Sequence, residues 1–216
     1  MRAAIGPKHR HYFTKNHSIE FEDLVKDLNL VYTHVDQVLT KRTQKNLETR
    51  TPKELFMSGR DLFRDDLLIR KITLGRHLGQ IASLLFDKAR VRIAYDQALR
   101  TTIQTESPFT QPCSLTQMSC FQPLLCGVII RLSNDLNPPN FFPQKPGNVV
   151  FFQHDFILPW TSLFQVPNQS FILIAYAPEK CRYVLQSDDL HTHALKKIGL
   201  GFGDALTNET HPLVFK

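Results

Sequence analysis

Apolar residues recur at helical spacing in three segments of the first half of the chain. The first segment covers residues 18–41; it has acidic residues in its first turn and basic residues at its end, which suits the helix dipole. Its stripe consists of Phe21, Leu24, Val25, Leu28, Val31, Tyr32, Val35, Val38 and Leu39. This spacing predicts one long amphipathic helix that buries a whole face.

Two shorter helices are predicted next. Thr51, Pro52 and Glu54 have the pattern of a capping box with proline at the first helical position, so a helix is expected over residues 51–63. Thr73 is the expected N-cap of a third helix that ends near Phe86. The apolar positions of that third helix are Leu74, Leu78, Ile81, Leu84 and Leu85.

The hydrophobic period changes to two after the third helix. Residues 91–95 alternate as in a strand with one buried face, and residues 126–132 do the same. Residues 96–122 between them are rich in Thr, Gln, Ser and Pro and show no period. We expect the two strands to pair as a hairpin with a long tip. Three helices followed by such a hairpin predict a winged helix.

The rest of the chain is predicted to be β-rich. Residues 134–147 contain four prolines and are expected to be a linker. Beyond it, strands are expected at residues 148–153, 171–176 and 182–186, and a short helix at 190–198. The predicted fold class is therefore α+β. A basic arm (1–17) precedes a winged-helix domain (18–133, with wing insert 96–122), and a β-rich region (148–216) follows.

Composition and charge narrow the possible functions. The 216 residues carry a formal net charge of +6, which suits an acidic partner such as DNA but is also common in proteins that bind none. No apolar run is long enough to cross a bilayer and no signal peptide is recognisable, so an intracellular protein with no membrane partner is expected. The four cysteines form no C-x-x-C pair, so buried thiols are expected rather than a zinc site.

Basic side chains near the third helix and the first strand are the candidates for DNA contact. A helix N-terminus and a wing can both meet phosphates, and the planar guanidinium of arginine matches phosphate oxygens. The candidates are Arg70, Lys71, Arg76, His77, Arg90, Arg92 and Arg100. A solvated basic face would explain the same residues.

One cluster could serve a metal-dependent enzyme. Residues 188–193 read Asp-Asp-Leu-His-Thr-His, and His154 and Asp155 lie elsewhere. Histidines and carboxylates could hold a divalent cation. Asp189 is explained more simply as a helix N-cap, so no metal, catalytic residue or cofactor is predicted.

The order of elements and the segment His-Leu-Gly-Gln-Ile at residues 77–81 together resemble a known family. It is the geminin-binding winged-helix domain of the eukaryotic DNA replication licensing factor, which helps load the MCM helicase at origins. In that family a His-Leu-x-Gln-[Ile/Leu] segment opens the third helix. The likeness covers residues 18–132.

The resemblance implies a nuclear, non-enzymatic adaptor in DNA replication and the cell cycle. Its implied partners are MCM subunits and a geminin-like coiled-coil inhibitor, with duplex DNA as a further candidate. The implied partner-binding residues are Phe21, Leu24, Leu28, Val31 and Tyr32. Two alternatives are a general DNA-binding winged-helix protein and a small metal-dependent hydrolase.

Overall fold

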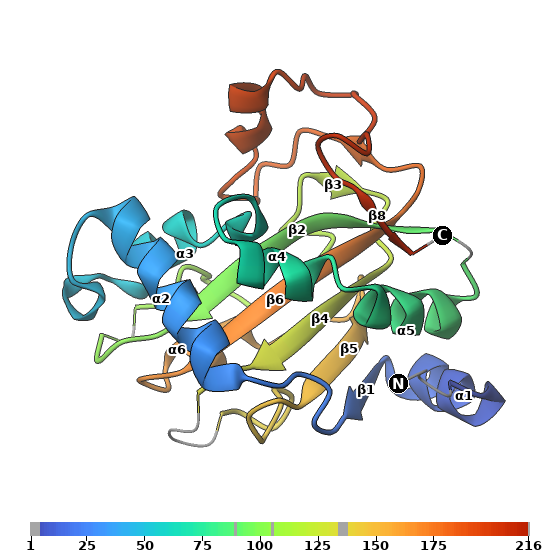
Figure 1. Cartoon of the computed structure of the whole chain (residues 1–216), viewed down its shortest axis with the longest axis horizontal. Helices are drawn as coiled ribbons and strands as arrows, with labels where there is room; N and C mark the ends of the chain where they lie inside the picture. Colours follow the sequence, from blue (N-terminus) through green and yellow to red (C-terminus); the bar gives the residue numbers. More distant parts are fainter. Residues whose placement is uncertain (1–4, 89, 105, 134–137, 216) are drawn as a thin grey trace.

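The computed structural model describes residues 5–88, 90–104, 106–133 and 138–215. Its centre is a six-stranded antiparallel sheet with the order β1-β5-β4-β6-β2-β8, which curls across the middle of the molecule (Figure 1). The strands are β1 (Ser18–Phe21), β5 (Val149–Gln153), β4 (Cys126–Arg131), β6 (Ser170–Pro178), β2 (Val91–Arg100) and β8 (Leu213–Phe215). The central strands are apolar on both faces, and both of their faces are covered.

Helices cover one face of this sheet (Figure 1). They are α1 (Pro7–Asn16), α2 (Leu28–Thr43), α3 (Pro52–Ser58), α4 (Leu67–Thr73) and α5 (Arg76–Phe86). Val35, Leu39 and Ile81 from the helices are fully buried in one cluster with Val128 and Ile174 from the sheet. We call this cluster the helix-side core.

The opposite face of the sheet is covered by a thinner layer. This layer contains the strands β3 (Phe121–Gln122) and β7 (Arg182–Tyr183), which pair with each other, and the helix α6 (Trp160–Phe164). Short 3₁₀ helices occur on both sides of the sheet: η1 (Leu47–Thr49) and η2 (Leu62–Arg64) on the helix side, and η3 (Ala194–Ile198) in this layer. Aromatic side chains such as Tyr95, Phe152 and Trp160 fill the space between the layers. We call this cluster the inner core.

The predicted winged helix is wrong because its two wing strands do not pair. β2 lies beside β6 along almost its whole length, from Val91 opposite Pro178 to Arg100 opposite Ser170, and β6 separates it from β4. β6 offers β2 a longer and more apolar partner than the six-residue β4 does. The fold is a curled antiparallel half-barrel with helices on its outside.

The predicted helix at residues 18–41 is divided in two. Residues 18–21 form β1, which pairs with β5 at the edge of the sheet, and α2 begins only at Leu28. Asp23 and Asp27 adopt positive φ angles of 55° and 56°, which a helix interior does not allow. The predicted helical stripe of residues 21–39 is therefore confirmed only within α2. Part of the predicted basic arm forms α1, and residues 1–4 lie outside the described residues.

The two shorter helices are confirmed with changed boundaries. Thr51 and Glu54 form the predicted capping box, but α3 ends at Ser58 because the next residues lie along β2. The third predicted helix begins at Arg76 with Gly75 as N-cap. Thr73 belongs to α4, and its hydroxyl donates to the backbone carbonyl of Ile69.

The strands of the second half are confirmed, but the half is not a separate unit. β1 and β2 from the first half share one sheet with β4, β5 and β6. The predicted wing insert contains the end of β2 and the whole of β3. Residues 134–137 of the predicted linker lie outside the described part of the chain. Within that part, no helix has the length and hydropathy needed to cross a membrane.

Candidate functional site

Residues 58–61 place an arginine on the inner face of the sheet. This segment lies along the free edge of β2: the Ala98 amide donates to the Gly59 carbonyl at 2.8 Å, and the Asp61 amide donates to the Asp96 carbonyl at 2.9 Å. A Cβ at position 59 would lie 2.8 Å from Nε2 of Gln97 and 3.0 Å from the Ala98 carbonyl oxygen, so glycine suits this close approach to the backbone of β2. Arg60 is thereby fixed opposite Gln97.

The Arg60 side chain is buried among polar and aromatic groups. Its Nε donates to Oε1 of Gln97 at 3.0 Å, and its Nη2 lies 3.3 Å from Oδ1 of Asp189. The guanidinium carbon lies 3.7 Å from the centre of the Tyr95 ring. Burial alone would lower the pKa of Arg60, but the Asp189 carboxylate and the other nearby groups together outweigh this, so the pKa is raised and the arginine stays charged.

Asp189 organises the rest of this group. Its carboxylate accepts from the backbone amide of Cys120 at 2.7 Å and from that of His191 at 2.8 Å. Burial raises the pKa of Asp189, but Arg60 and these amides lower it by more, so it is ionised. We call Arg60, Tyr95, Gln97, Cys120, Asp189 and His191 the Arg60 cluster.

Two buried nitrogens of the Arg60 cluster lack a hydrogen-bond partner. They are Nη1 of Arg60 and Nε2 of His191. Burial and the nearby Arg60 charge lower the pKa of His191 to about 3, so its imidazole is neutral at physiological pH. Unpaired buried polar atoms are costly, and a ligand or an ordered water relieves that cost.

A small cavity is lined by the chain neighbours of Asp189. It has a volume of about 230 Å³ and is formed by residues 108–118 together with residues 187–190. Asp188 and Leu190 of its wall flank Asp189 in the chain. Phe109, on the opposite wall, contacts Phe56 with ring centres 5.2 Å apart. The lining combines apolar side chains with polar ones and a single carboxylate, Asp188, as in sites for small organic molecules.

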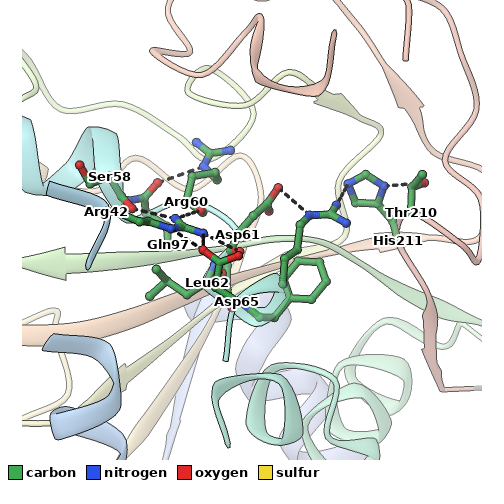
Figure 2. Close-up of polar contacts among 12 residues, drawn as sticks. Arg42, Ser58, Arg60, Asp61, Leu62, Asp65, Gln97, Thr210 and His211 are labelled. Carbon is green, nitrogen blue, oxygen red and sulfur yellow. Dashed lines mark hydrogen bonds and ion pairs between the residues drawn. The ribbon is translucent and has the colours of Figure 1, made fainter. Parts of the chain in front are cut away.

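The helix-side face of β2 carries a second polar network, which Figure 2 shows from Arg42 to Thr210. Arg42 donates to the carbonyls of Ser58, Arg60 and Asp61 and pairs with Asp65 at 2.7 Å. Further along, Nη2 of Arg64 lies 3.3 Å from Nε2 of His211, and the other ring nitrogen of His211 lies 3.0 Å from the Thr210 hydroxyl. The network fixes the segment that carries Arg60.

Asp96 lies beneath this network with no exposed surface. Its carboxyl accepts from the amides of Leu62 at 2.6 Å and Phe63 at 3.0 Å. Burial, reinforced by the nearby Asp61, raises the pKa of Asp96 to about 8. Asp96 and Tyr95 are neighbours on opposite faces, so β2 carries polar groups into both cores.

The candidate DNA-binding residues divide into two groups. Arg70, Lys71, Arg76 and His77 lie together where α4 meets α5. The other three are held by the protein: Arg90 pairs with Glu179, Arg92 donates to three backbone carbonyls, and Arg100 pairs with Asp36 and Glu48. Arg92 and Arg100 are only 4% and 5% exposed. DNA contact at these seven residues stays a prediction.

The candidate partner-binding residues do not form one face. Phe21 lies on β1 against Phe151, whereas Leu24 and Val31 line a cavity between α2, α4 and α5. Leu28 packs against the helix-side core, and the Tyr32 ring lies 5.3 Å from the Arg100 guanidinium carbon.

The acidic and histidine cluster is not assembled as a metal site. Asp189 pairs with Arg60, His191 points into the inner core, and the His193 ring lies 5.7 Å from that of Phe202. His154 contacts the Thr116 hydroxyl. Asp189 is not the N-cap either, since η3 begins only at Ala194.

No protein-family profile and no curated protein sequence matches this chain. Solved structures do. The non-haem α-ketoglutarate-dependent carbocyclase SnoK from nogalamycin biosynthesis is 11% identical, with a TM-score of 0.68 over 97% of this chain and 96% of its own. The corresponding epimerase SnoN is 10% identical, with a TM-score of 0.69 over 96% and 97%.

This chain shares their fold. HygX from Streptomyces hygroscopicus, solved with nickel and 2-oxoglutarate bound, is a further example: it is 12% identical, with a TM-score of 0.59 over 95% of this chain and 98% of its own. The curled sheet is thus of the cupin or jelly-roll kind.

The comparison overturns the resemblance drawn from the sequence. The sheet is not that of a winged helix, and the solved structures SnoK and SnoN, which share this fold, are α-ketoglutarate-dependent enzymes, so the identification as a replication licensing factor is wrong. The non-enzymatic adaptor role, the MCM and geminin-like partners and the link to DNA replication lose their basis with it. The DNA-binding and hydrolase alternatives gain no support, and nuclear localisation stays untested.

The residues present do not fit the iron of those enzymes. Non-haem iron oxygenases hold iron with two histidines and one carboxylate on one side of the metal. Among the described residues, no three His, Cys, Asp or Glu side chains are placed to hold a metal ion. The polar groups on the inner face of β2 belong to the Arg60 cluster and not to a set of metal ligands.

Sequence reasoning missed the Arg60 cluster almost entirely. Of its members, only Asp189 and His191 stand out from the sequence as candidates for a functional site, as metal ligands. Arg60 follows a glycine in a polar stretch, and Gln97 was assigned to an aperiodic insert. One usable signal existed: Tyr95, Gln97 and Leu99 continue the alternation of β2, which places a glutamine on a buried face.

Proposed function

We propose that this protein is an enzyme that acts on a small organic molecule bound on the inner face of the sheet, beside the Arg60 cluster. The observation that carries the proposal is the pair of buried, unpartnered nitrogens on Arg60 and His191. The fold supports it, because the enzymes named above share this architecture.

The chemistry of the two nitrogens defines the group they would recognise. Nη1 of Arg60 can only donate. The other ring nitrogen of His191 is hydrogen-bonded to the Phe56 backbone, so it carries the proton and Nε2 of the neutral imidazole can only accept. Both residues contact Oδ1 of Asp189, His191 through its backbone amide. A ligand that presents a carbonyl oxygen beside a hydroxyl or N–H group would satisfy both nitrogens.

The charge balance favours an uncharged ligand group. Asp189 already neutralises Arg60, so a carboxylate would add an uncompensated negative charge to a buried site. A hydroxy-amide or hydroxy-ester avoids this cost. Arg60 would polarise the carbonyl of such a ligand, as electrophilic catalysis requires, and His191 would hold the hydroxyl. The body of the ligand would lie against Phe109, Met118 and Leu190.

Ligand-observed NMR tests binding, and a time course of the same samples tests turnover. Lactamide and mandelamide should bind, whereas propionamide, which lacks the hydroxyl, should bind more weakly. His191→Phe keeps a ring of similar size and should reduce lactamide binding to the level of propionamide. His193→Phe, two residues away and exposed, is the matched control.

Two outcomes would overturn the proposal. The first is lactamide binding that His191→Phe leaves unchanged, or no binding by any hydroxy-carbonyl compound. The second is turnover that requires both iron(II) and 2-oxoglutarate, which would mean a metal site that the Arg60 cluster does not provide. Binding without turnover of any bound compound would remove the catalytic part.

A further inference from the structure

A second cavity of about 230 Å³ lies on the helix side of the sheet, apart from the Arg60 cluster. It opens where the start of α2 meets α4 and α5. It is lined by apolar and basic residues from these elements and one carboxylate: Leu24, Val25, Lys26, Asp27, Val31, Leu68, Lys71, Ile72, Gly75, His77 and Leu78. The proposed function uses none of them.

The floor of this cavity is apolar. Val25, Val31 and Leu78 are buried there, and Leu68 and Ile72 are half-buried at its sides. These side chains belong to the helix-side core, so the rigid packing of that core shapes the floor. An aliphatic group could remove this surface from water.

The rim of the cavity is basic. Lys26, Lys71 and His77 line it against one carboxylate, Asp27, and Lys26 already pairs with Asp23. Among the described residues, no acidic side chain pairs with Lys71 or His77. The chain has no Asp or Glu between residues 67 and 86, whereas it has Arg70 and Arg76 beside the rim.

We propose that this cavity binds an aliphatic monocarboxylate of medium chain length, with its carboxylate at Lys71 and His77 and its chain on the apolar floor. Charge complementarity selects the anionic head and the floor selects the chain. A volume of 230 Å³ corresponds to about eight water-sized groups, at about 30 Å³ each, which fits a chain of about six to eight carbons.

Isothermal titration calorimetry on the full chain tests this with sodium octanoate, sodium hexanoate and 1-octanol. Octanoate should bind with one site per chain. Hexanoate should bind roughly fifteenfold more weakly, since each methylene contributes about fourfold, or about 0.8 kcal/mol. Octanol, which lacks the charge, should also bind more weakly than octanoate.

Variants of the rim and the floor locate the site. Lys71→Ala should weaken octanoate binding by about two- to fivefold, as expected for an exposed ion pair. Leu68→Trp should fill the cavity and abolish binding. Lys41→Ala, an exposed lysine near the other end of α2, is the matched control and should change nothing. Circular dichroism melts confirm that each variant is folded.

Octanol binding as tightly as octanoate would overturn the proposal, as would octanoate binding that Lys71→Ala and Leu68→Trp leave unchanged. A DNA duplex that binds through Lys71 while octanoate does not bind would overturn it in favour of a nucleic-acid surface. His191→Phe should leave octanoate binding intact, because His191 does not line this cavity. The proposal for this cavity and the proposed function can therefore be refuted independently.

Discussion

Replacing Asp96 by asparagine should change how the stability of this protein depends on pH. Asp96 is fully buried on β2, and its carboxyl accepts from the backbone amides of Leu62 and Phe63. Its pKa of about 8 lies well above the usual 3.8, because burial and the nearby Asp61 disfavour the charged form. An asparagine side chain does not titrate.

The raised pKa sets the sign and the size of the effect. A carboxyl that binds its proton more tightly in the folded state contributes stability that is fully present below pH 3.8 and is lost as the pH rises through about 8. Each pH unit within this window costs about 1.4 kcal/mol. From pH 5 to pH 7 the wild-type protein should therefore lose about 3 kcal/mol through Asp96, and Asp96→Asn should not.

Urea unfolding at pH 5 and at pH 7 measures the difference. At pH 5 the variant should be less stable by about 1–3 kcal/mol, because its single amide oxygen cannot accept from both amides. At pH 7 that deficit should vanish or reverse. Asp87→Asn, whose side chain is 91% exposed, is the control and should show no such change. A deficit that is equal at both pH values would refute the reasoning.

Three further predictions concern the two cores. His191 and His211 are buried with pKa values lowered to about 3, so the stability they contribute is present above pH 6.5 and is lost as the pH falls towards 3. Acid unfolding of a His211→Gln variant should therefore begin at lower pH than that of wild type, and an unchanged onset would contradict this. Gly127→Ala should destabilise by about 3 kcal/mol or more, since the new Cβ would lie 2.0 Å from the Phe152 ring, and a melting temperature within a degree of wild type would contradict this. Burial raises the pKa of the Cys113 thiol to about 11, so it should react with a disulfide reagent far more slowly at pH 8 in the native protein than in urea, and equal rates would disprove the burial argument.

The hydrophobic period located most helices and strands but not their partners. The stripe of α2, the capping box of Thr51 and the alternation of β2, β4, β5 and β6 were all readable from local spacing. Pairing is not local. The sequence offered β4 as the next strand after β2, whereas β6, about 70 residues further on, takes that place. Residues 18–21 were counted as helix because Phe21 also fits a helical stripe.

The five-residue motif that suggested a licensing factor has a plain structural explanation. Leu78 and Ile81 are buried positions of the amphipathic helix α5, and a Cβ on Gly79 would lie 2.6 Å from the Val214 side chain. These requirements arise wherever a helix packs closely on a strand. The motif therefore reports local packing and carries no information on the fold around it.

The candidate site could not be assembled from sequence because its members are far apart in the chain. Arg60 and Gln97 are separated by 37 residues, and Arg60 and Asp189 by 129. Each is unremarkable in its own segment. Only the curled sheet and the segment along its edge bring them into contact, and neither follows from periodicity.

The strand order also determines when this chain can finish folding. Its two edge strands are β1, at residues 18–21, and β8, at residues 213–215, and β1 pairs with a strand about 130 residues later. β1 must wait for a partner that the ribosome makes much later, and topologies dominated by such distant pairings fold slowly. Until β5 has been synthesised, β1 has no partner in this sheet. Nascent chains that end before β5 should therefore expose unpaired apolar strand edges and bind chaperones more than chains in which the sheet has formed.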